Sequence, residues 1–127
     1  MDKLLLVFVG GGLGSVARYL TGVAAMKGFG PGWPYGTFAV NILGGLIMGL
    51  LVGWLALRGG ADQERWRVLI GVGVLGGFTT FSSFSLETAL MLERRDYGAA
   101  AGYAGASVVL AIGALFLGLL AARRIFA

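Results

Sequence analysis

The sequence predicts an all-α membrane protein with four transmembrane helices, the third of them broken near its centre. Of the 127 residues, 57% are hydrophobic and only 13% are charged, which is about half the charged share of an ordinary soluble domain. A soluble domain this small could not bury so much apolar surface. Four apolar stretches also reach the roughly 20 residues that a membrane-spanning helix needs. We expect residues 1–127 to form a single four-helix domain.

The predicted spans are separated by residues that break helices or carry charge. The first two spans, residues 4–26 and 33–57, flank a Gly- and Pro-containing turn at residues 27–32. The third span, residues 66–92, follows a polar loop at residues 58–65, and a charged hairpin at residues 93–96 leads to the fourth, residues 97–122. Aromatic residues lie near the span ends, as is typical of membrane interfaces: Trp33, Tyr35, Trp54, Trp66 and Tyr97.

The basic residues indicate membrane topology better than nucleic-acid binding, because they lie mostly at span ends. The side with the N-terminus, the middle loop and the C-terminus carries six of them: Lys3, Arg58, Arg65, Arg67, Arg123 and Arg124. The other side carries three: Lys27, Arg94 and Arg95. This mild bias favours an N-terminus inside and also permits insertion in both orientations.

The composition argues against an enzyme. The chain has neither cysteine nor histidine, which excludes disulfides, thiolate metal sites and the commonest general base. The pattern G-x-G-x-x-G occurs at Gly71, Gly73 and Gly76, but it lies inside an apolar span rather than after a strand of a soluble unit, so we reject a nucleotide site.

The glycines predict close helix packing. Three sets are spaced four residues apart: Gly10 and Gly14; Gly45, Gly49 and Gly53; and Gly98 and Gly102. This spacing places small residues on one helix face and lets backbones approach. Four helices with such faces favour an oligomer over a monomer.

Residues 76–85, GGFTTFSSFS, carry the strongest functional signal. Five hydroxyl side chains occur within residues 79–85, and such residues, together with glycines, weaken a helix. The segment lies near the middle of the third span, where irregular backbone is tolerated only if it is buried in protein or lines a cavity. A Ser- and Thr-rich packing face is the alternative interpretation.

Polar groups from all four spans converge on one half of the membrane. Asn41 is expected either to line a polar pathway or to form an interhelical hydrogen bond. Tyr103 and Ser107 have ordinary alternatives as an interfacial tyrosine and a hydroxyl bonded to its own helix. Arg18 and Glu87 lie at similar heights, so they are expected either to form an ion pair or to belong to a vestibule in which Arg18 attracts anions.

Phe81 and Phe84 are three residues apart and therefore share a helix face. An aromatic ring has a positive edge. Two such edges, together with amide and hydroxyl donors, could hold a small and partly dehydrated anion.

At these residues the chain resembles the Fluc (CrcB) family of fluoride channels. The similarity rests on residues 33–37 leading to Asn41, on residues 76–85 with Glu87, on residues 103–107, and on residues 11–18 in the first span. It covers nearly the whole chain, although Ala111 stands where the family often continues a polar track.

The resemblance implies a fluoride-selective channel of the bacterial plasma membrane, built as an inverted homodimer with two antiparallel pores. It implies that the pore is lined by Asn41, Phe81, Phe84, Ser82, Ser83, Tyr103 and Ser107. It further implies that the backbone carbonyls of Gly76 and Thr79 hold a structural sodium ion at the dimer interface.

Two other functions are weighed against the channel. A small proton-coupled multidrug exporter would need a central carboxylate, whereas the one embedded acid, Glu87, is off-centre in the third span. A non-transporting membrane subunit would not need the hydroxyl and phenylalanine cluster.

Overall fold

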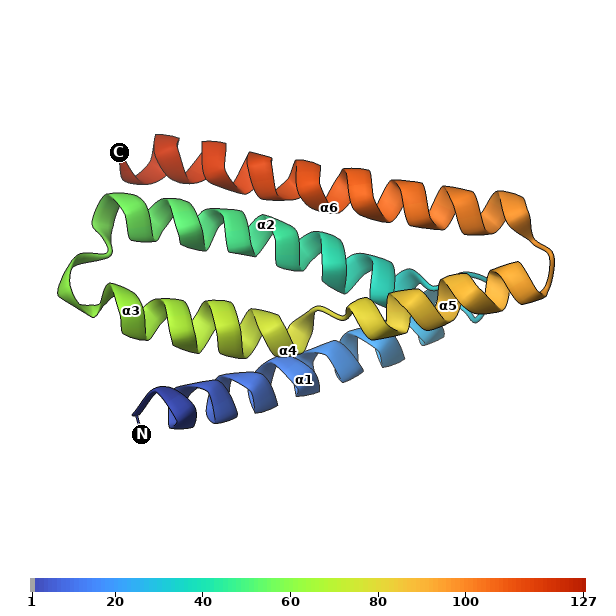
Figure 1. Cartoon of the computed structure of the whole chain (residues 1–127), viewed down its shortest axis with the longest axis horizontal. Helices are drawn as coiled ribbons and strands as arrows, with labels where there is room; N and C mark the ends of the chain where they lie inside the picture. Colours follow the sequence, from blue (N-terminus) through green and yellow to red (C-terminus); the bar gives the residue numbers. More distant parts are fainter. Residues whose placement is uncertain (1) are drawn as a thin grey trace.

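The structure is a computed structural model that describes residues 2–127. It contains 4 helical spans long and apolar enough to cross a membrane: Asp2–Phe29, Tyr35–Arg58, Gly60–Glu93 and Tyr97–Phe126. Figure 1 shows them running roughly along one direction, with both chain ends and the connection between the second and third spans at the same end. The predicted four-helix architecture is therefore confirmed.

The first, second and fourth spans are each one continuous helix: α1 (Asp2–Phe29), α2 (Tyr35–Arg58) and α6 (Tyr97–Phe126). The turn after α1 contains Gly30 at φ +80°, a backbone conformation that side chains other than that of glycine disfavour. Pro34 precedes α2, in keeping with the preference of proline for helix starts.

The third span is assembled from several pieces. It begins with the short turns η1 (Gly60–Asp62) and α3 (Gln63–Trp66), continues as the π-helix η2 (Arg67–Leu75) and the turn α4 (Gly76–Phe78), and ends as α5 (Phe81–Glu93). Between α4 and α5 the backbone is extended, with ψ 158° at Thr79 and φ −152° at Thr80. The break is visible between α4 and α5 in Figure 1. It confirms the interruption predicted near the centre of this span; the π-helical winding before it was not predicted.

Two of the three glycine sets pack as expected. Side chains added at Gly10 and Gly14 would collide with the backbone of η2 and α4, because α1 lies directly against them. Gly45, Gly49 and Gly53 of α2 face α6 in the same way, and α2 and α6 form the most extensive helix pair of the fold. Gly98 and Gly102 have nothing within 4 Å of the corresponding position, so packing at that set is not realised within the chain.

Two glycines of the G-x-G-x-x-G pattern also contribute to helix packing. Gly71 and Gly73 are buried in η2, where Gly73 lies against Gly10 and Gly71 against Leu51. A buried helical segment of this kind cannot present backbone N–H groups to a phosphate, which supports the rejection of a nucleotide site.

Candidate functional site

The break in the third span is held by one side chain from α2. The Thr80 N–H donates to Asn41 Oδ1 at 2.8 Å, and Asn41 Nδ2 donates to the Thr80 carbonyl at 3.1 Å. The amide of Asn41 thus satisfies both backbone groups of a residue that has left the helix. Unpaired backbone groups at membrane depth are costly, so this pair of hydrogen bonds makes the extended conformation tolerable.

Thr80 also begins the next helix. Its hydroxyl accepts a hydrogen bond from the Ser83 N–H at 3.1 Å, which makes Thr80 the N-cap of α5. The same hydroxyl lies 3.2 Å from Ser82 Oγ. The capping bond, the Asn41 bridge and the Ser82 contact bring three predicted site residues, Asn41, Ser82 and Ser83, around one backbone position.

Because the Thr80 and Ser83 N–H groups have other acceptors, two backbone carbonyls lack their usual helical donors. In a continuous helix the Thr80 and Ser83 N–H groups would be directed at the carbonyls of Gly76 and Thr79, four residues earlier. Here they donate to Asn41 and to the Thr80 hydroxyl instead. Gly76 and Thr79 are the residues whose carbonyls were expected to bind a cation.

Arg18 of α1 reaches the other side of the same break. Its Nε donates to the Gly77 carbonyl at 3.0 Å. The guanidinium lines an open groove of about 490 Å³ together with Lys27, Thr37, Thr80 and Ser83. The rest of the lining is largely apolar, and the groove reaches the break at Thr80 and Ser83, so the two cations mark it as an approach route for an anion.

Arg18 and Glu87 have different partners. Glu87 Oε1 accepts a hydrogen bond from the Tyr103 hydroxyl at 3.1 Å, whereas Arg18 is bonded to Gly77. No ion pair joins the two among residues 2–127. Of the two expected arrangements, the ion pair is not formed within residues 2–127, and the vestibule role of Arg18 stays a prediction.

Tyr103 is the centre of an aromatic cluster. It is completely buried, and its ring centroid lies 5.2 Å from that of Phe84 and 5.2 Å from that of Trp33. Trp33 also packs edge-on against Phe38 at 4.9 Å. The Phe84 ring therefore packs against the Tyr103 ring. Trp33 packs against the same tyrosine, and the hydrogen bond to Glu87 orients the Tyr103 hydroxyl.

Phe81 differs from Phe84 in its surroundings. The two rings lie 5.5 Å apart, yet Phe81 is 77% exposed, while Phe84 is half-buried. The pair spans the boundary between the interior of the chain and its surface. A single chain consequently does not enclose Phe81.

Ser107 lies one helical turn beyond Tyr103 on α6 and is buried. Its hydroxyl has no hydrogen-bond partner within the part of the chain that the structure describes. The alternative in which Ser107 bonds to its own helix is thus not adopted. A buried hydroxyl without a partner is costly, so the Ser107 hydroxyl is free to hydrogen-bond a group from outside the described chain.

Two residues of the site were missed from the sequence. Thr80 was treated as one of several hydroxyls, although a Thr three residues before Ser83 fits an N-cap. Trp33 was interpreted as an interfacial aromatic, and only the fold shows that its ring supports Tyr103.

The fold and the site define a small polytopic membrane protein whose interrupted span exposes backbone and hydroxyl groups at mid-membrane. A sequence model of the family described as CrcB-like protein, Camphor Resistance (CrcB), matches residues 5–119. The chain belongs to this family.

Curated relatives match along the full length. A protein of Caulobacter sp. (strain K31) is 70% identical over 99% of this chain and 98% of its own length. A protein of Phenylobacterium zucineum (strain HLK1) is 68% identical over 100% of both chains, and one of Hyphomonas neptunium (strain ATCC 15444) is 54% identical over 100% of both. All three are named "Fluoride-specific ion channel FluC".

Proposed function

We propose that this chain is a fluoride-selective ion channel of the bacterial plasma membrane that lets cells expel fluoride and resist its toxicity. The observation that carries the proposal is the broken third span, where Thr80 and Ser83 line a groove that also contains Arg18 and Lys27. Relatives named as fluoride-specific channels, 70% and 68% identical to it over essentially their whole length, support it.

The pore is lined by Asn41, Ser82, Ser83, Phe81, Phe84, Tyr103 and Ser107. Fluoride enters from the groove beside Arg18 and exchanges its water shell for hydroxyl and amide donors and for the positive edges of the phenylalanine rings. The unpartnered Ser107 hydroxyl supports this assignment, because an ion passing it would supply the missing partner. None of these seven lining residues is charged, and the nearby Glu87 carboxylate is bound by the Tyr103 hydroxyl, which lets the ion leave again.

The functional unit is an inverted homodimer with two antiparallel pores. The exposure of Phe81 supports this assembly, since a second chain would be needed to close the wall around its ring. A second open groove of about 320 Å³ is lined by small and apolar residues and includes Asn41, Gly44, Gly76 and Thr79. Small residues of this kind permit close contact between helices of two chains.

A structural sodium ion binds on the two-fold axis of that dimer through the carbonyls of Gly76 and Thr79. The residues fit the group, because both carbonyls have lost the N–H partner of a regular helix and hard cations prefer oxygen ligands. Residues 2–127 hold no cluster of three or more acidic, His or Cys side chains, so such a site would depend on backbone oxygens. When bound, the ion would join the two breaks electrostatically.

The deciding experiment is fluoride efflux from liposomes that contain the purified protein, followed with a fluoride electrode. We expect passive fluoride release that is independent of a proton gradient, and no chloride release under the same gradient. Proton-dependent release of a cationic dye instead would favour the multidrug exporter, and the absence of any flux from correctly assembled dimers would favour the non-transporting subunit.

The sodium proposal needs its own measurement. Replacing sodium with N-methylglucamine on both sides is expected to lower the melting temperature of the dimer and its fluoride flux together, and returning sodium should restore both. An unchanged melting temperature would contradict the cation site while leaving the channel itself intact.

A further inference from the structure

A small groove opens where the molecule meets the membrane surface, at the end that carries the N-terminus. It measures about 270 Å³ and is lined by Leu6, Asp62, Arg65, Trp66 and Leu69. Trp66 packs edge-on against Trp54 at 6.0 Å, and tryptophans gather at the depth of lipid headgroups. The groove therefore straddles the boundary between hydrocarbon and water.

The two ends of the groove differ in chemistry. Leu6 and Leu69 are half-buried and provide an apolar floor on the membrane side. Asp62 and Arg65 are exposed at its rim, one anionic and one cationic. A ligand that fits would carry an apolar tail and two opposite charges.

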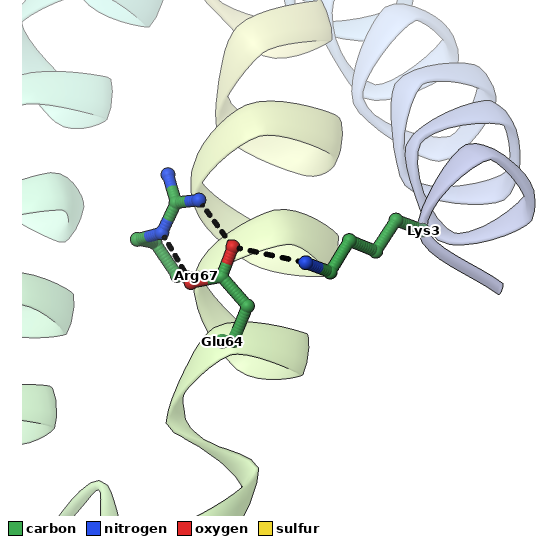
Figure 2. A network of polar contacts seen from close by, with 3 residues as sticks. All are labelled: Lys3, Glu64 and Arg67. Atoms are coloured by element: carbon green, nitrogen blue, oxygen red, sulfur yellow. Dashed lines mark hydrogen bonds and ion pairs between the residues drawn. The ribbon is translucent and has the colours of Figure 1, made fainter.

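Three charged residues beside the groove interact with one another. Glu64 accepts hydrogen bonds from Arg67 at 2.6 and 3.2 Å and lies 3.6 Å from Lys3, and Figure 2 shows this three-residue network joining the start of α1 to the third span. Neither Asp62 nor Arg65, the charged residues at the rim of the groove, takes part in this network.

The rim charges are weakly engaged by comparison. Within residues 2–127, Arg65 forms one ion pair, with Asp2 at 3.9 Å, and both side chains are largely exposed. Asp62 precedes α3 without forming a side-chain cap, and it makes no ion pair within residues 2–127. Both groups are available to a ligand.

We propose that this groove binds the headgroup of a zwitterionic phospholipid with a primary amine. Arg65 holds the phosphate, because a guanidinium matches phosphate oxygens in charge and geometry. Asp62 accepts hydrogen bonds from the ammonium, and the first part of an acyl chain lies on Leu6 and Leu69. A quaternary amine lacks the N–H donors for Asp62, and a purely anionic headgroup leaves that carboxylate facing negative charge.

Native mass spectrometry of the full-length protein, delipidated in detergent and then titrated with lipid, tests the proposal. We expect phosphatidylethanolamine to bind more tightly than phosphatidylcholine or phosphatidylglycerol. Arg65→Gln should weaken phosphatidylethanolamine binding by about fivefold, the effect of one charge contact at a membrane surface. Asp62→Asn should remove the preference over phosphatidylglycerol.

Arg123→Gln is the matched control, because it removes one exposed cation at the same end without touching the groove. An equal loss in Arg65→Gln and Arg123→Gln would overturn the site in favour of general surface charge. An unchanged lipid preference in Asp62→Asn would also overturn it, as would soluble phosphoethanolamine binding as tightly as the lipid. Fluoride efflux should be retained in all three variants, so the outcome is independent of the proposed channel function.

Discussion

Asn41 on the second span and Thr80 in the third bind each other through both of the backbone groups of Thr80, at 2.8 and 3.1 Å. The Asn41 oxygen replaces the helical acceptor that the Thr80 N–H loses where the backbone becomes extended. It also takes the N–H that would otherwise be directed at the Gly76 carbonyl. The proposed pore wall and the proposed cation site therefore depend on the same side chain.

Replacing Asn41 with alanine should destabilise the protein by about 1–3 kcal/mol, because it leaves the partly buried Thr80 N–H unpaired. Fluoride flux should fall as well. Thermal unfolding in detergent and the fluoride electrode measure the two effects. A variant with unchanged stability would show that the bridge is not needed to hold the break.

Phe81→Ile and Phe84→Ile should each reduce fluoride flux by at least about fivefold, the factor that corresponds to about 1 kcal/mol, while the dimer still assembles. An aliphatic side chain removes the positive ring edge and keeps the apolar volume. Phe116→Ile, at an exposed position on α6, is the control and should conduct normally. Unchanged flux in liposomes would remove Phe81 or Phe84 from the pore.

Because Phe84 packs against Tyr103 and Phe81 is largely exposed, the two variants should differ in stability. Phe84→Ile should lower the melting temperature of the separated protomer more than Phe81→Ile does. Equal effects in the separated protomer would contradict a stabilising contact between Phe84 and Tyr103.

Ser107→Ala separates stability from conduction. Since the Ser107 hydroxyl lacks a partner within the described residues, its removal should leave the unfolding free energy unchanged or raise it by up to about 1 kcal/mol. Flux should nevertheless fall if the hydroxyl donates to passing fluoride. A variant that conducts like the wild type would show that the hydroxyl plays no part in permeation.

Arg95→Gly should stabilise the hairpin between α5 and α6. Arg95 has φ 60°, and its N–H donates to the Leu92 carbonyl while the Asp96 N–H donates to the Met91 carbonyl, the Schellman arrangement in which glycine is preferred. Relief of the left-handed conformation should be worth about 1 kcal/mol. The melting temperature measures it, with Arg94→Gly, at a right-handed position, as a control that should not gain stability.

Much of the fold could be predicted from local patterns. The lengths of the apolar stretches predict the spans, and the hydroxyl-rich segment after Gly76 predicts the interruption that the structure places at Thr79 and Thr80. The spacing of Gly10 with Gly14 correctly predicts close packing, but the same spacing at Gly98 and Gly102 does not find a neighbour within the chain. Glycine spacing predicts a helix face made of small residues, but it does not predict which helix packs against that face.

The sequence by itself determined the membrane class, the number of spans and the position of the break, because hydrophobic length and helix-breaking composition act within one segment. Only the tertiary structure decided that Asn41 bridges Thr80, that Arg18 turns to Gly77 and that Glu87 turns to Tyr103. These partners lie 16 to 59 residues apart in the chain. Which polar groups meet across a bilayer depends on helix rotation and height, and these are set by the packing of all four spans together.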